Sequence, residues 1–263
     1  MPPYPLHSAG GFYFNKQTCV ICYYEYMALK LSIIIPTLNN SRTLPLALLS
    51  IDDQLSKSGF LYEIIITDRG SNDATKVIAD RFAALLPRVK YMSIGKNISE
   101  GAAARAALLH AKGDWRVIMP AAGNISVDEF QKILPRLLSG YDLVLGSRAL
   151  RRSVVQPQLQ FHVRFFRILH NVAIQLTALP GIWDTESGFL CLNGSLAEKL
   201  LPKLKEGGAG WVVELAMLAR RCGFRVKELP IFWGNTEPFV FRRYLECLKG
   251  AFNSRIRSLK GLY

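Results

Sequence analysis

Two predicted strand ends carry the residue types that are most informative about chemistry. The apolar run at 63–67 is followed by Asp68 and Arg69, an acid and a base in sequence. A guanidinium can bind phosphate oxygens in a bidentate way without a metal ion. The apolar run at 115–119 is followed instead by Pro120-Ala121-Ala122, which offers no side-chain oxygen to Mg²⁺ or Mn²⁺. We therefore expect a phosphate site at which Arg69 supplies positive charge and no divalent ion is bound; a solvated or salt-bridged Arg69 is the alternative.

Alternating strands and helices are expected to position these residues. Apolar runs typical of buried parallel strands occur, with helical periodicity between them, at 33–35, 63–67, 89–94, 115–119 and 143–145. The pattern predicts a Rossmann-like, doubly wound and mostly parallel α/β sheet in one domain. Ligands of such sheets bind beyond the carboxyl ends of the strands, so residues 120–123 are expected at the floor of a site.

Three later segments complete the expected elements. The polar, basic segment at 149–160 predicts a loop beside the site. A helix is expected at 161–179, with large apolar residues along one face. The pattern Ser195-Leu-Ala-Glu198 predicts a capping box at the start of another helix.

The chain divides into three predicted parts. Residues 1–26 are expected to lie outside the fold, because Met27 begins a segment that looks like an ordinary protein start directly before the first strand. Residues 27–237 form the α/β domain, and residues 238–263 form a basic tail. In this tail apolar residues recur along one helical face, and six basic residues stand against one acid, Glu246. A basic amphipathic helix is typical of a membrane-surface element, and a terminal helix packed on the domain is the alternative.

The net charge of +13 implies an anionic partner. No helix-turn-helix, zinc-finger or aromatic RNA-recognition pattern occurs, so we expect no nucleic acid and retain an anionic membrane surface or a phosphorylated small molecule. The five cysteines form no disulfide framework, and Cys19-Val-Ile-Cys22 lacks a second pair or a nearby histidine. No run approaches the ~20 apolar residues of a bilayer span. We expect a cytoplasmic protein that is peripheral on a membrane.

Several segments resemble the family 2 glycosyltransferases of the GT-A fold, and among them the polyprenyl-phosphate (dolichyl-phosphate) sugar synthases. These segments are 31–40, 62–71, 112–123, 142–148, 184–189 and 226–233. The likeness covers residues 31–233 but departs from the family pattern at charged positions. The family's Asp-x-Asp-Gly reads Pro120-Ala121-Ala122-Gly123, and its Asp-Asp-Gly-Ser reads Asp68-Arg69-Gly70-Ser71. A helix lysine of the family is Glu100 here, and an aspartate is Val212.

The resemblance implies roles for matching residues. The residues that match the nucleotide site of the donor are Pro36, Leu38, Asn39, Asp68 and Arg69. Those that match phosphate or acceptor contacts are Arg105, Arg148 and Arg164. Asp184 and Glu214 match positions near the transferred sugar and are the catalytic candidates. A role in shaping a strand end explains the nucleotide group equally well, and a turn or helix cap explains Asp184.

The resemblance implies transfer of a sugar from a nucleotide diphosphate donor to a polyprenyl phosphate of the dolichyl type. The acceptor is already an anion, so catalysis depends on neutralising the leaving diphosphate and aligning the substrates rather than on a general base. Family members use Mg²⁺ or Mn²⁺, whose ligands are lost here, so we expect no metal cofactor. The alternative is a catalytically inactive glycosyltransferase homologue that acts as a binding protein.

Overall fold

A seven-stranded sheet forms the centre of the molecule. The computed structural model describes residues 30–123, 125, 128–234 and 240–263. The strand order is β3-β2-β1-β4-β7-β5-β8, and only β7 runs antiparallel to its neighbours. The bounds of these strands are β1 Lys30–Thr37, β2 Leu61–Asp68, β3 Val89–Ser93, β4 Trp115–Ile118, β5 Leu143–Ser147, β7 Leu190–Asn193 and β8 Val226–Pro230. The predicted doubly wound, mostly parallel sheet is confirmed.

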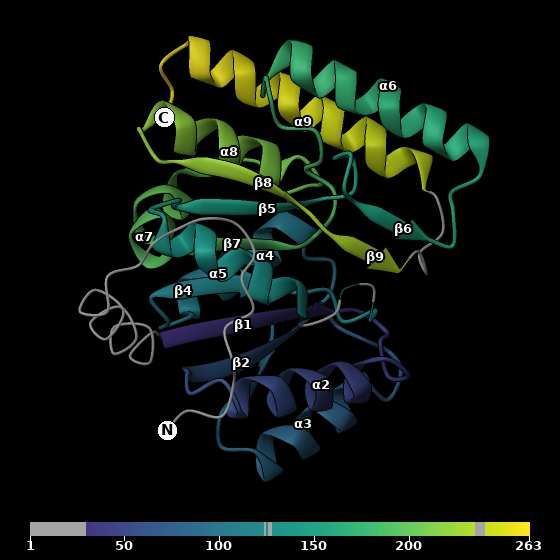
Figure 1. Cartoon of the computed structure of the whole chain (residues 1–263), viewed down its shortest axis with the longest axis vertical. Coiled ribbons are helices and arrows are strands. Elements are labelled where there is room, and N and C mark those ends of the chain that lie inside the picture. The colour runs from purple at the N-terminus through teal and green to yellow at the C-terminus, as the bar shows by residue number, and fades with distance from the viewer. Residues whose placement is uncertain (1–29, 124, 126–127, 235–239) are drawn as a thin grey trace, which may run out of the picture.

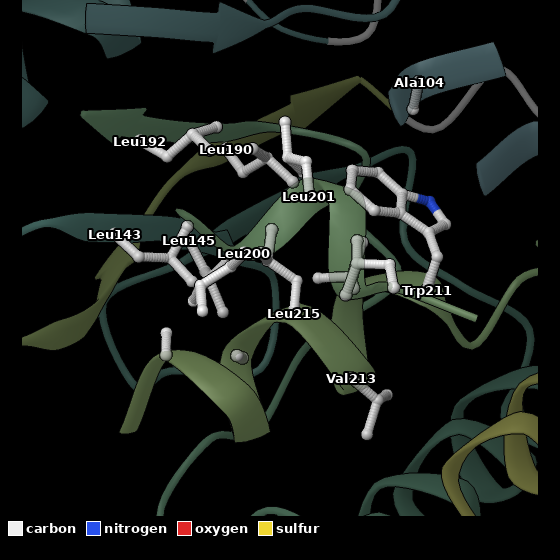
Figure 2. Packing of buried hydrophobic residues seen from close by; sticks show 14 of the residues in the cluster. Ala104, Leu143, Leu145, Leu190, Leu192, Leu200, Leu201, Trp211, Val213 and Leu215 are labelled. Carbon is white, nitrogen blue, oxygen red and sulfur yellow. The ribbon is translucent and has the colours of Figure 1, made fainter. Parts of the chain in front are cut away.

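Alternation along the central strands sends side chains to two core layers. In β1, Ile34 belongs to one layer, whereas Ile33 and Ile35 belong to the other, and all three are at most 1% exposed. The flanking helices are α2 Leu44–Ser56, α3 Thr75–Leu85, α4 Glu100–His110, α5 Asp128–Leu138, α7 Gly194–Leu200, followed by the 3₁₀ turn Leu201–Lys203, and α8 Trp211–Arg221. Figure 2 shows the layer in which Leu143 and Leu190 face Leu200, Trp211 and Leu215. Burial on both faces explains why the strand sequences are continuously apolar.

Two further helices, α6 Phe161–Thr177 and α9 Phe241–Leu259, lie side by side outside α8 (Figure 1). The predicted terminal helix therefore packs on the domain, and it does so through small residues. At Gly250 an added Cβ would lie 3.0 Å from the Cα of Gly210, the residue before α8. Most of the large apolar residues of α9 instead face outward, since Phe241, Leu245, Phe252 and Leu259 are 48–72% exposed, whereas Leu248 packs against the core.

The apolar face of α6 is also largely uncovered. Its exposed fractions reach 85% at Phe161, 54% at Phe165, 56% at Leu169 and 82% at Leu176. None of the helices in the described ranges is both long and apolar enough to cross a membrane. The expected N-terminal part, residues 1–26, and the CxxC pair lie outside the described residues.

Local differences from the sequence expectation have simple causes. The predicted loop at 149–160 contains β6, Val154–Gln156, because this segment pairs in parallel with β9, Phe232–Gly234. The capping box expected at Ser195 is wrong, because α7 begins at Gly194, so its N-cap lies two residues before Ser195. Its N-cap is Asn193, whose side chain accepts the Leu196 N–H at 2.7 Å.

Candidate active site

A cavity of about 300 Å³ opens where β1 and β4 end, at the point where the strand order reverses. We call it the strand-end cavity. Predicted residues that line it are Pro36 near the end of β1, Leu38 after β1, Arg69 after β2, and the segment Pro120-Ala121-Ala122 after β4. The structure thus brings together three chain segments that the sequence placed at one site. In the described part of the chain Arg69 has no ion-pair partner, so its guanidinium is available to a ligand.

Asp68 and Asn39 shape the turns behind this cavity and do not line it. Asp68 is 2% exposed; Oδ1 accepts the backbone N–H of Ser71 at 2.9 Å, and Oδ2 accepts the hydroxyl of Tyr91 at 3.0 Å. Asn39 has a φ of 57°, and its Oδ1 accepts the N–H of Asn72 at 2.8 Å. Both side chains therefore hold the loops that carry Leu38 and Arg69.

A second guanidinium, that of Arg243 on α9, lines the same cavity. Its Nη2 lies 2.8 Å from Glu100 Oε1, and its Nε lies 3.1 Å from Glu186 Oε2. Burial alone lowers the pKa of Arg243, but the two carboxylates raise it above its ordinary value, so the group stays charged. The sequence did not predict this contact, because Arg243 and Glu100 are 143 residues apart.

The described residues of this cavity do not fit the divalent metal ion, Mg²⁺ or Mn²⁺, that members of the resembled family bind. Pro120-Ala121-Ala122 contributes no carboxylate where the family has two. The carboxylates that do line the cavity are Glu100 and Glu186, and both are paired with Arg243. A hard divalent cation prefers free oxygen ligands, so this arrangement favours direct contact between guanidinium groups and an anion.

Asp184 and Arg148 form a buried ion pair. Arg148 Nε and Nη2 lie 2.7 and 2.8 Å from the two carboxylate oxygens, and the Arg148 backbone N–H donates to Oδ2 at 2.8 Å. Burial of Asp184 would raise its pKa, but the Arg148 guanidinium holds the pKa at about 2. The guanidinium also lies 4.9 Å from the ring centroid of Trp233. The carboxylate is therefore fully engaged with basic groups in this state.

A second cavity, of about 510 Å³, lies between the segment after β5 and helix α6. Among the residues that the structure describes, four arginines and no acidic residue line it: Arg148, Arg151, Arg164 and Arg167. We call it the arginine cavity. The structure thus joins the two predicted residues Arg148 and Arg164 and adds two others. Arg167 follows Arg164 by three residues on one helix, a spacing that sequence reasoning had available.

The two cavities are neighbours. Trp233 lines the strand-end cavity, and its ring packs against Arg148, which lines the arginine cavity. The contact between Arg148 and Trp233 therefore joins the two cavities.

Glu214 and Arg105 lie outside both cavities. Glu214 is 0% exposed; Oε2 accepts the backbone N–H groups of Lys205 and Glu206, and Oε1 accepts the hydroxyl of Tyr263 at 2.5 Å. Arg105 donates to the carbonyl oxygen of Leu204 at 2.5 Å. The structure does not bring these two predicted residues to the other site residues.

Comparison with known proteins identifies the family. The model of glycosyl transferase family 2 matches residues 32–209. The chain belongs to glycosyl transferase family 2. The predicted family and enzyme class are thereby confirmed. Relatives of this glycosyltransferase include the dolichyl-phosphate beta-glucosyltransferases of Trichomonas vaginalis and Saccharomyces cerevisiae. Both are 26% identical to it; the alignments cover 85% and 89% of this chain, and 71% and 76% of the relatives.

Solved structures share the fold of this glycosyltransferase. Glucosyl-3-phosphoglycerate synthase from Mycobacterium tuberculosis in complex with UDP has a TM-score of 0.67 at 16% identity, covering 95% of this chain and 86% of that chain. Mannosyl-3-phosphoglycerate synthase from Rubrobacter xylanophilus has a TM-score of 0.66 at 14% identity, covering 94% and 79%. The likeness is one of fold, and it confirms the predicted GT-A type.

Proposed function

We propose that this glycosyltransferase moves a sugar from a nucleotide diphosphate donor in the strand-end cavity to a polyprenyl phosphate of the dolichyl type. The acceptor phosphate would bind in the arginine cavity. The observation that carries the proposal is the contact between Arg148 and Trp233, which joins the two cavities. The dolichyl-phosphate beta-glucosyltransferases among the relatives support the choice of acceptor.

Positive side chains perform the electrostatic part of the reaction. Arg69, which has no ion-pair partner among the described residues, neutralises part of the charge of the leaving diphosphate. Arg243 balances Glu100 and Glu186 at the same cavity, so that these carboxylates do not repel the diphosphate. Arg151 and Arg164 hold the acceptor phosphate, while Asp184 fixes Arg148 between the two ligands. The phosphate oxygen is already anionic and attacks the sugar carbon directly, so that alignment rather than proton removal lowers the barrier.

We propose that α6 and α9 place the arginine cavity at an anionic membrane surface. Arg164 and Arg167 of α6 line the cavity, while Phe165 and Leu169 of the same helix are more than half exposed. The apolar face of α9 continues this surface, since Phe166 of α6 and Phe241 of α9 have ring centroids 5.5 Å apart. Exposed apolar residues beside basic groups suit an interfacial helix, and the prenyl chain of a bound lipid phosphate would follow the same face. The cytoplasmic location stays a prediction.

A transfer assay tests the function. The full chain is incubated with labelled nucleotide diphosphate sugars and dolichyl phosphate in vesicles, with and without a chelator. We expect a labelled dolichyl phosphate sugar in both conditions. Arg164→Ala should lower its formation, whereas Arg81→Ala, an exposed arginine of α3 outside both cavities, should not.

A second candidate function is binding without turnover. It is favoured by the complete engagement of both catalytic candidates, Asp184 by Arg148 and Glu214 by the 205–206 backbone and Tyr263. Binding of dolichyl phosphate with no product from any nucleotide sugar would support this candidate and contradict the first.

A further inference from the structure

Three buried groups with ligand chemistry meet beside the strand-end cavity. They are His170 on α6, Glu186 in the segment before β7, and Cys247 on α9. One ligand atom of each lies within 4.8 Å of the others, and the residues are 3%, 9% and 0% exposed. No two of them are close in sequence, so spacing alone did not show the cluster.

Two of the three ligand atoms have unmet bonding capacity. Within the described ranges His170 Nε2 and Glu186 Oε1 are buried and have no hydrogen-bond partner. Cys247 is a free thiol. Buried polar atoms without partners cost free energy, and a native structure usually supplies a ligand or water for them.

The second polar atom of His170 and of Glu186 already has a partner. His170 Nδ1 lies 3.3 Å from the carbonyl oxygen of the Asn171 side chain, so a proton on Nδ1 leaves a lone pair on Nε2. Glu186 Oε2 accepts from Arg243, which leaves Oε1 open. The ring of Tyr244 packs edge-on against the imidazole, 5.0 Å between centroids. This arrangement, in which outer partners orient the ligands, is typical of metal sites.

We propose that His170, Glu186 and Cys247 bind one Zn²⁺ ion, with a fourth position open to water. Imidazole, carboxylate and thiolate are all zinc ligands, and three protein ligands with an open position are a known coordination pattern. In tetrahedral coordination the bond lengths of these ligands place the ligand atoms about 3.3 to 3.8 Å apart. The three ligand atoms here lie within 4.8 Å of one another, so small side-chain rotations would bring them to those distances.

The surrounding charges accommodate the ion. Arg148, Arg167 and Arg243 face this region, and they are balanced by Asp184, Glu100 and Glu186 itself. The thiolate that forms on binding offsets part of the added charge. Glu186 lines the strand-end cavity, which gives the ion a route of entry.

The site is separate from the transfer reaction of the proposed function. A bound ion would connect α6, α9 and the segment that carries Glu186. It would therefore fix the wall of the strand-end cavity that Arg243 contributes, without contacting the residues that replace the family's metal ligands.

Zinc and cobalt titrations of the full chain test the proposal. The titrations use a variant that carries Cys19→Ser, Cys22→Ser and Cys222→Ser. These changes remove two thiols outside the described residues and one exposed thiol. After chelation and gel filtration we expect one equivalent of Zn²⁺ to bind and to raise the thermal midpoint. Co²⁺ should give a thiolate-to-metal charge-transfer band in the near ultraviolet.

Variants separate this site from incidental binding. Cys247→Ser should abolish the cobalt band, and His170→Gln or Glu186→Gln should weaken zinc affinity at least tenfold. The matched control is Cys191→Ser, a buried cysteine of β7 outside the cluster, which should leave binding unchanged. If Cys247→Ser does not fold, Glu186→Gln still tests the proposal. This variant keeps the thiol, so the cobalt band should appear, but only at higher cobalt concentrations. Absence of bound zinc in the parent, or equal zinc binding by the folded ligand variants, overturns the proposal.

Discussion

Replacing Asp184 by asparagine should destabilise the fold in a way that depends on pH. The carboxyl has a pKa of about 2 against an ordinary value of 3.8, because Arg148 stabilises its charged form. Each pKa unit corresponds to about 1.4 kcal/mol, so the ionised group contributes on the order of 2 to 3 kcal/mol to the free energy of unfolding at neutral pH. Asp184→Asn also leaves Arg148 buried without a charged partner, and loss of one member of a buried pair costs about 3 to 5 kcal/mol.

Urea unfolding of Asp184→Asn between pH 7 and pH 2 measures this effect. The folded-state pKa is depressed, so the contribution is complete above the unfolded pKa near 3.8 and is lost as the pH falls through 2. The difference between the natural protein and the variant should therefore shrink across this window. The matched control is Asp80→Asn, which removes an exposed pair with Lys76 and should cost at most about 1 kcal/mol. A pH-independent difference, or equal effects of the two substitutions, would refute the assignment of Asp184 as the anchor of Arg148.

Three further predictions concern ligands. Arg164→Ala should weaken dolichyl phosphate binding by about 1.5 to 3 kcal/mol, the range for hydrogen bonds to charged groups, and leave nucleotide binding unchanged. Calorimetry measures both affinities, and an equal loss of the two would contradict separate cavities. Added Mg²⁺ or Mn²⁺ should not alter the affinity for nucleotide diphosphates, whereas Arg69→Ala should lower it. An affinity that rises with either ion would show that the strand-end cavity has metal ligands after all. Phe165→Glu should reduce co-sedimentation with anionic vesicles more than Val77→Glu, a similarly exposed position of α3, and equal binding by both variants would remove α6 from the membrane surface.

The sheet and the strand-end cavity could be predicted from the sequence because their signals are local. Continuous β-branched runs such as Ile33 to Ile35 occur where strands are covered on both faces. The position of a site beyond the strand ends follows from the fold class, so Arg69 and residues 120–122 could be placed together before the structure.

Partners across long sequence separations could not be predicted in the same way. Nothing near Arg243 indicates that its partners are Glu100 and Glu186, and nothing near Glu214 indicates that Tyr263 will take one of its oxygens. Helical periodicity showed that α6 and α9 are amphipathic, but it did not show which face is covered. In α9 the buried residues are small, and Gly250 among them allows the helix to approach its neighbour closely.

The close approach of Gly250 to Gly210 affects how variants of this protein should be interpreted. Gly250 lies seven residues, about two helical turns, from Arg243 on the same helix. A larger side chain at Gly250 would push α9 away from α8 and move Arg243 with it. A substitution at this position would then be classified as a change in a peripheral helix, although it would also displace Arg243 and so change the strand-end cavity, in which we propose that the donor binds.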